Sequence, residues 1–197
     1  MFLLENGYAL SFPEGMNFDD DELFAFCQAN PELNIERNKN KQLLIMSPAG
    51  SLSGFYHFQI LMALGKWNEN KDGYVFDSST GFTLPDGSMR SPDVAWVSSE
   101  KWNKLTLNQK EKFAPICPEF VVEVASPSDS IKELKNKMIE WVANGIGLGW
   151  LIDVKEEQTF IYSTNRLTGS LDSFDNILEG NDVLPGFTFD LKILRKK

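Results

Sequence analysis

Two carboxylates stand in stretches that otherwise predict buried strands. Glu123 lies in the middle of the run FVVEVA, and Asp93 follows Pro92 at the start of the run VAWV. A bare carboxylate is costly to bury, so each of these residues needs a partner. Two strands that each bear one carboxylate form a minimal magnesium site, completed by a backbone carbonyl, waters and phosphate oxygens of a substrate. The pair therefore indicates metal-assisted chemistry on a phosphate.

Each carboxylate also has a simpler interpretation. Because side chains alternate along a strand, Val121 and Glu123 share one face, while Val122 and Val124 share the other. An edge strand with Glu123 in solvent would show the same pattern. Asp93 would then be an ordinary cap or turn residue, a common use of aspartate after proline. The sequence pattern leaves both interpretations open.

A helix predicted over residues 129–144 offers the lysine that such a site would need. Its apolar residues recur with helical spacing, and its lysines occupy the other positions. A helical wheel at about 100° per residue places Lys135 nearer the apolar centre than Lys137. Most helix lysines are simply solvated. A lysine beside two metal-bound carboxylates would instead hold the attacking water or stabilise charge on the phosphate.

The elements that must position these residues follow a strand–helix–strand order. Apolar strands are predicted over residues 120–126 and 148–154, and the helix over 129–144 joins them, which favours a parallel pair. A hairpin is predicted around residues 38–41, a helix over 55–70, and further strands over 73–84, 91–98, 158–163 and 187–191. We expect one α/β domain spanning residues 1–197, with a central mixed sheet flanked by helices.

Composition limits the functional classes. The formal net charge is -9, which argues against a protein that binds nucleic acid by a basic surface alone, although metal ions or a local basic patch can offset repulsion. Cys27 and Cys117 match no metal-binding spacing and fit a reducing cytoplasm. The start of the chain lacks the basic region of a secretory signal. No apolar run approaches ~18 residues, so no membrane span is expected.

Longer segments resemble a known family. Pro92-Asp93 followed by Glu123-Val124-Ala125 is similar to the bipartite motif of the PD-(D/E)XK nuclease superfamily. The segments EVASPSDS, KMIEWVANGIGLGWLID and LEGNDVLPGF, together with IMSP and the helix that carries His57, resemble the Uma2 family within it. The resemblance covers nearly the whole chain. It implies a restriction-endonuclease-like fold and hydrolysis of DNA phosphodiester bonds with Mg²⁺, or Mn²⁺ in its place.

The resemblance also assigns site residues. Asp93 and Glu123 match the metal-binding carboxylates of the family. The lysine expected two residues after Glu123 is replaced by Ala125, and the family's lysine on the following helix matches Lys137. The resemblance thus favours Lys137 as the site lysine, whereas the helical wheel leaves Lys135 as the alternative.

Three further positions follow from the same resemblance. The carbonyl of Val124 would be a metal ligand, and His57, the only histidine, would have a supporting role near the cleft. Family members often have glutamate where Gln42 stands, so this difference weakens the case for activity. A catalytically silent nuclease-like module for binding or assembly is the competing hypothesis. Under either hypothesis, the apolar C-terminal segment suggests a homodimer.

Overall fold

The computed structural model describes residues 2–4, 7–13, 17–127, 129–164 and 166–195. Its central sheet has six strands, of which only β9 and β10 are parallel neighbours. In spatial order the strands are β12 (Arg166–Leu171), β11 (Gln158–Ser163), β10 (Leu148–Asp153), β9 (Phe120–Ala125), β8 (Val94–Ser98) and β5 (Gly73–Asp77).

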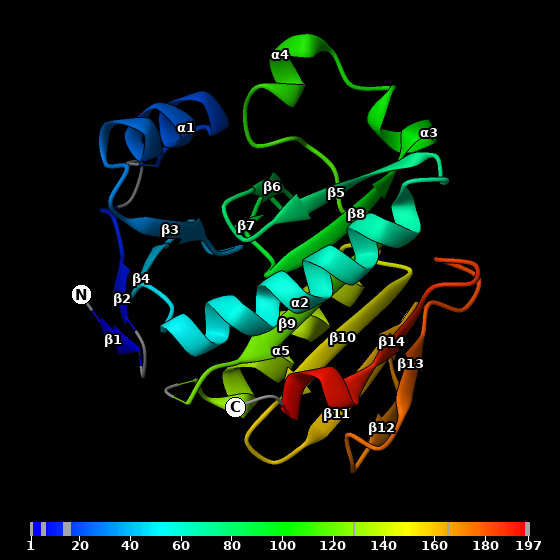
Figure 1. Ribbon diagram of the computed structural model, residues 1–197. Coiled ribbons are helices and arrows are strands. Elements are labelled where there is room, and N and C mark those ends of the chain that lie inside the picture. Colours follow the sequence, from blue (N-terminus) through cyan, green and yellow to red (C-terminus); the bar gives the residue numbers. More distant parts are fainter. Residues whose placement is uncertain (1, 5–6, 14–16, 128, 165, 196–197) are drawn as a thin grey trace.

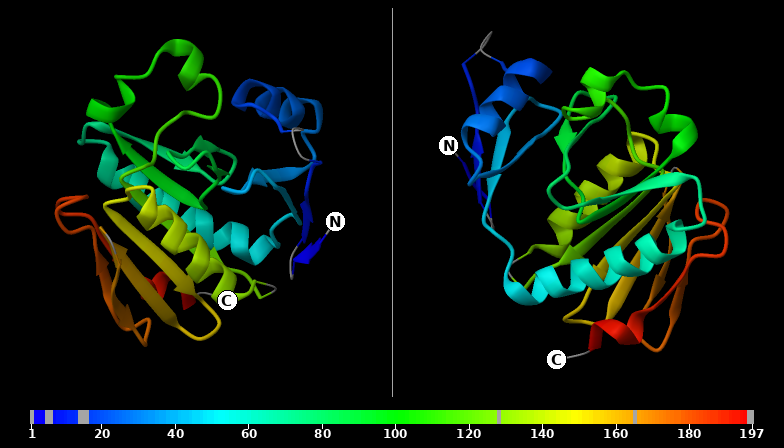
Figure 2. Two further views of the ribbon diagram at one scale, coloured as in Figure 1. Left: turned by 180° about the vertical axis from the view of Figure 1, so that it is seen from behind. Right: turned by 45° about the horizontal axis from the view of Figure 1, so that its top comes forward.

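Helices cover both faces of this sheet (Figures 1 and 2). Helix α2 (Ser51–Asn68) crosses one face, and α5 (Ile131–Ala143) lies on the other and connects β9 to β10. The predicted strand–helix–strand unit with parallel strands is therefore confirmed. Gly145, with φ 102°, follows the end of α5 in the left-handed region that favours glycine.

The side chains of β9 alternate between two hydrophobic cores, one on each face of the sheet, as predicted. Val122 and Val124 pack in the cluster on the α2 side, whereas Val121 packs with the α5 residues Met138 and Trp141. Glu123 therefore faces α5, and it is only 2% exposed. Because β9 lies between β10 and β8, the interpretation of an edge strand with Glu123 in solvent is wrong.

A second, antiparallel sheet lies beside the first (Figure 1). It contains β1 (Phe2–Leu4), β2 (Gly7–Leu10), β4 (Leu43–Met46), β3 (Asn34–Arg37), β7 (Met89–Arg90) and β6 (Phe82–Thr83). The predicted hairpin around residues 38–41 joins β3 and β4. The segment 91–93 runs from β7 in this sheet to β8 in the central sheet, so the Pro92-Asp93 motif lies at their junction.

The remaining elements are the helix α1 (Asp20–Ala29) and several short ones. The short ones are α3 (Ser99–Trp102), α4 (Leu107–Lys110), the paired strands β13 (Ile177–Glu179) and β14 (Thr188–Asp190), and the 3₁₀ helix η1 (Leu191–Arg195). Leu191 and Leu194 are buried in the core that contains α2. The expectation that the C-terminal apolar segment offers a pairing surface is therefore wrong, because those side chains fill the protein's own core.

Two further expectations concern the whole chain. Cys27 and Cys117 are both free thiols. Within the residues that the structure describes, none of the helices combines the length and the apolar character needed to cross a bilayer.

Candidate active site

The Pro92-Asp93 motif changes the hydrogen bonding at the end of β9. The Val124 N–H donates to Oδ2 of Asp93 over 2.7 Å. The register pairs Val94 with Val122, so its continuation places Pro92 opposite Val124. Proline has no N–H, so the ladder bond that would normally reach the Val124 carbonyl cannot form. The motif thus provides a carboxylate and, next to it, a carbonyl that lacks its donor from β8.

Glu123 is fixed by two side chains of α5. The indole N–H of Trp141 donates to Oε1 over 2.9 Å, and Nζ of Lys137 lies 2.9 Å from Oε1 and 3.1 Å from Oε2. Trp141 is fully buried and packs in the core on the α5 side of the sheet. It also positions the carboxylate, because its N–H is the only polar group of an otherwise apolar ring.

Lys137 lies at the centre of the site. Its ammonium group donates to the carbonyl of Ser91 over 3.0 Å and lies 3.0 Å from Oε1 of Glu36 and 2.9 Å from Oε1 of Glu123. Lys135 points elsewhere, with Nζ 3.8 Å from the centre of the Phe160 ring. The Lys135 side chain thus contacts Phe160, a residue of the core on the α5 side. That position takes it away from the carboxylates and leaves Lys137 beside them.

Glu36 is a third carboxylate that the sequence analysis missed. It lies in β3 of the second sheet and is 1% exposed. Arg90 donates to Oε2 over 2.7 Å, and the N–H of Ser91 donates to Oε1 over 2.9 Å. Burial by itself would raise the pKa of Glu36, but the charges of Lys137 and Arg90 outweigh it and lower the pKa to about 2. Glu36 is thus ionised throughout the physiological range.

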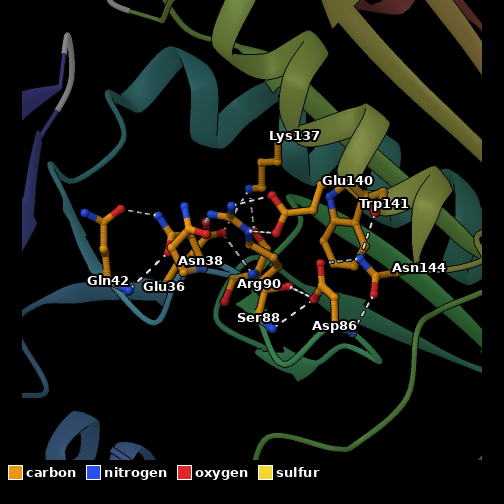
Figure 3. A network of polar contacts seen from close by, with 12 residues as sticks. Glu36, Asn38, Gln42, Asp86, Ser88, Arg90, Lys137, Glu140, Trp141 and Asn144 are labelled. Carbon is orange, nitrogen blue, oxygen red and sulfur yellow. Dashed lines mark hydrogen bonds and ion pairs between the residues drawn. The ribbon is translucent and has the colours of Figure 1, made fainter. Parts of the chain in front are cut away.

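Figure 3 shows this network extending from Lys137 through Arg90. Besides Glu36, Arg90 binds Glu140 of α5, with Nε donating to Oε1 over 3.1 Å and Nη2 donating to Oε2 over 2.6 Å. Gln42 lies at the opposite end of the group from α5 (Figure 3), where its side chain bonds to Ser11 over 2.7 Å and accepts from Asn38 over 2.9 Å. Gln42 therefore does not occupy a position beside Asp93 and Glu123, and the buried carboxylate comes from Glu36 instead.

Asp93 and Glu123 are held in an environment that disfavours their charged forms. Burial raises the pKa of Asp93 to about 6 and that of Glu123 to about 7, although the charge of Lys137 opposes both shifts. Repulsion from Asp93 and Glu36 adds to the rise at Glu123. The carboxylates outnumber the cations that face them, so the negative charge of the site is not fully neutralised.

These donors fit a small, hard divalent cation. Oxygen is the preferred ligand of Mg²⁺, which commonly uses one or two carboxylates and keeps several waters. Asp93, Glu123 and the Val124 carbonyl supply such a set. Among the residues that the structure describes, no cluster of three or more His, Cys, Asp or Glu side chains is arranged to hold a metal. Two carboxylates and one carbonyl are fewer donors than the six ligands of Mg²⁺, so water and substrate oxygens would have to supply the others.

His57 and the cleft complete the site. Nε2 of His57 lies 3.3 Å from Oδ2 of Asp93, without the alignment of a hydrogen bond. Burial lowers the pKa of His57, so the imidazole is neutral at pH 7 and the contact is not an ion pair. The site opens into a cleft of about 800 Å³ that is also lined by the start of α2. Among the described residues that line it, Lys137 is the only Lys or Arg.

Comparisons with known proteins agree with this arrangement. A family model described as "Uma2: Putative restriction endonuclease" matches residues 20–192. The crystal structure of "a putative nuclease belonging to DUF820" from Anabaena variabilis ATCC 29413 is similar, with a TM-score of 0.69 and 20% identity, over 83% of this chain and 90% of that one. At this identity the likeness concerns the fold, and it confirms the predicted fold class. No curated protein matches the sequence.

Proposed function

Because the chain belongs to the Uma2 family of restriction-endonuclease-like proteins, we propose that it is a metal-dependent nuclease that hydrolyses phosphodiester bonds in DNA. The observation that carries the proposal is the convergence of three side chains in one cleft: Asp93 from the segment just before β8, Glu123 from β9 and Lys137 from α5. Two buried carboxylates with raised pKa values beside a lysine are typical of sites that bind a divalent cation and a phosphate.

Asp93 and Glu123, with the carbonyl of Val124, would hold Mg²⁺ or Mn²⁺. A bound ion of this kind lowers the pKa of a coordinated water and polarises the scissile phosphate. The chain fixes the two carboxylates by hydrogen bonds before any ligand arrives. Asp93 accepts from the Val124 N–H, and Glu123 accepts from Trp141. Such preorganised groups need little rearrangement at the moment of reaction.

Lys137 would orient the attacking water or stabilise the negative charge that develops on the phosphate. Its three N–H donors have three described acceptors, so one bond must be exchanged for a substrate oxygen. Glu36 is the acceptor that can best release it, because Arg90 and the N–H of Ser91 continue to satisfy its carboxylate. Glu36 therefore acts in this scheme as a positioning residue for Lys137.

Cleavage of supercoiled plasmid and of single-stranded DNA, with Mg²⁺ or Mn²⁺ and with EDTA as the control, tests the proposal. Asp93→Asn and Lys137→Met should each lower the cleavage rate by at least about 100-fold. Lys135→Met, two residues away on the same helix, is the matched control and should cleave at the wild-type rate. Equal loss in both lysine variants would contradict the role of Lys137.

The competing hypothesis of a silent module is supported by the acidic surface and by Gln42. The side chain of Gln42 bonds to Ser11 and Asn38, whereas Glu36 supplies a buried carboxylate beside Lys137, which favours the nuclease hypothesis. The acidic net charge remains compatible with activity because a bound cation offsets part of it.

We also propose a homodimer in the cytoplasm. The two free thiols suit a reducing compartment. Phe58 and Met62, one turn apart on the outer face of α2, are 56% and 52% exposed and give the second copy an apolar contact. Sedimentation of the wild type and of Phe58→Lys, which should be monomeric, tests this arrangement.

A further inference from the structure

The N-terminus of α2 is open toward the cleft. Gly50 is its N-cap and provides no side-chain hydrogen bond, and the first helical turn contains no acidic residue. The first backbone bond of the helix runs from Gly54 to Gly50 over 3.1 Å, so the N–H groups of residues 51–53 precede the helical ladder. Gly50 and Ser51 both line the cleft. An 18-residue helix therefore directs its positive end and uncapped amides into it.

A second observation at this helix end points to a ligand. Ser53 is 4% exposed and lines the cleft, and no hydrogen bond to its hydroxyl is present in the described part of the chain. It lies four residues before His57, so both occupy one face of α2, about one 5.4 Å turn apart. His57 in turn contacts Asp93. Ser53 therefore lies on α2 between the open helix end and His57, the residue that contacts Asp93.

The charge of the cleft makes this helix end important. Lys137 is the only Lys or Arg among the described lining residues, and Glu36 and Glu123 already share its charge. A nucleic acid strand carries a phosphate on every nucleotide, and proteins bind such phosphates through cations and N–H or O–H donors. The amides at the start of α2, with the Ser53 hydroxyl, are a set of such donors in the same cleft.

We propose that the N-terminus of α2 binds a phosphate of the substrate strand next to the scissile one. The inference depends on the proposed nuclease function for the identity of the ligand. The amides of residues 51–53 and the hydroxyl of Ser53 would donate to the phosphate oxygens. The subsite would fix the register of the strand, so that the scissile phosphate meets Asp93, Glu123 and Lys137.

Gly50→Asp is the sharpest perturbation of this subsite. Gly50 has φ −67° and ψ 158°, which any residue adopts, and a Cβ added there would meet nothing within 4 Å. An aspartate N-cap accepts from the first-turn amides and complements the helix dipole, so the variant should unfold at the same temperature as the wild type or higher. The same carboxylate would occupy the amides and repel phosphate. Asn108→Asp, in the first turn of α4, is the charge-matched control.

Amide resonances of residues 51–53, followed by NMR in EDTA, test the subsite without requiring cleavage. In the wild type and in Asn108→Asp, inorganic phosphate or dimethyl phosphate should shift these resonances in a saturable way, and in Gly50→Asp neither should. A response to dimethyl phosphate identifies an internal phosphate, and a response to inorganic phosphate alone identifies a terminal one. Shifts that are absent in the wild type, or retained in Gly50→Asp, would overturn the proposal.

Steady-state cleavage in saturating Mg²⁺ supplies the functional readout. Gly50→Asp should raise KM for a short DNA strand by about tenfold, as expected for losing a charge-assisted bond, with a smaller change in kcat. Asn108→Asp should match the wild type. Cleavage with no amide shift would refute the subsite and leave the nuclease proposal standing. Amide shifts in a protein that does not cleave DNA would refute the nuclease proposal and leave the phosphate subsite standing.

Discussion

Replacing Lys137 by methionine should destabilise the protein in a pH-dependent way. The ammonium group of Lys137 is the shared cation of two buried carboxylates, Glu36 and Glu123. Its side chain is only 16% exposed, so solvent screens these contacts weakly. Methionine keeps most of the apolar volume and removes the charge, which isolates the electrostatic contribution.

The magnitude follows from the two partners. Removing one member of a buried ion pair costs about 3–5 kcal/mol, because the remaining charge has no compensation. The pKa of Glu36 lies near 2, so its carboxylate is charged at both pH 5 and pH 8, and Arg90 still neutralises part of it. The pKa of Glu123 lies near 7, so it is mostly protonated at pH 5 and charged at pH 8. We expect Lys137→Met to cost about 1–2 kcal/mol at pH 5. At pH 8 the cost should be about 1.4 kcal/mol higher, because a carboxyl with a pKa near 7 can avoid an uncompensated charge by taking up a proton at about that free-energy cost.

Urea unfolding in EDTA at the two pH values measures this difference. Lys135→Met is the matched control, since it removes a lysine from the same helix and should cost about 0.5–1 kcal/mol at either pH through the lost contact with Phe160. A cost for Lys137→Met that equals that of Lys135→Met at pH 8 would refute the assignment of Lys137 as the compensating charge. A cost for Lys137→Met that is the same at pH 5 and at pH 8 would refute the raised pKa of Glu123.

Three further outcomes follow from the site. Because burial raises the pKa values of Asp93 and Glu123 from the ordinary 3.8 and 4.5 to about 6 and about 7, the metal-free protein should lose stability as pH rises from about 4 to 8, by up to about 3 kcal/mol per group. Thermal unfolding in EDTA checks this, and Mg²⁺ should raise the unfolding temperature more at pH 8 than at pH 5. Trp141→Phe leaves Oε1 of Glu123 without its indole donor and should cost about 1–3 kcal/mol in urea unfolding at pH 8. Gln42→Ala removes only peripheral bonds and should keep wild-type cleavage, with a loss of about 1 kcal/mol. Loss of activity in Gln42→Ala would contradict its placement outside the site.

The parts of the site that lie on regular elements could be predicted from the sequence. Alternation in the run FVVEVA placed Glu123 opposite Val122 and Val124, and the structure agrees because β9 has a core on each face. The strand–helix–strand order predicted the parallel pair and the helix between them. These features depend on local periodicity, which each segment carries by itself.

The missed parts depend on contacts between distant segments. The sequence pattern predicts only that Glu36 belongs to a hairpin, because its partners Arg90 and Lys137 lie on other elements. A glutamate in the middle of a short strand was the available signal, and it was the same signal that singled out Glu123. The helical wheel described the core correctly but could not show which lysine meets a carboxylate. The strands β1, β2, β12 and β13 were not predicted, since pairing with neighbours stabilises them more than their own patterns indicate.

The three contacts of Lys137 come from separate parts of the fold. Glu36 belongs to the second sheet, Ser91 to the junction between the sheets, and Glu123 to the central sheet. The ammonium group of the proposed catalytic lysine therefore also links two layers of the fold. Any displacement of β3 relative to β9 would pull a partner away from it. Displacement or removal of the second sheet would therefore misplace Lys137 in the proposed active site. A chain without that sheet should lose activity even where the central sheet still folds.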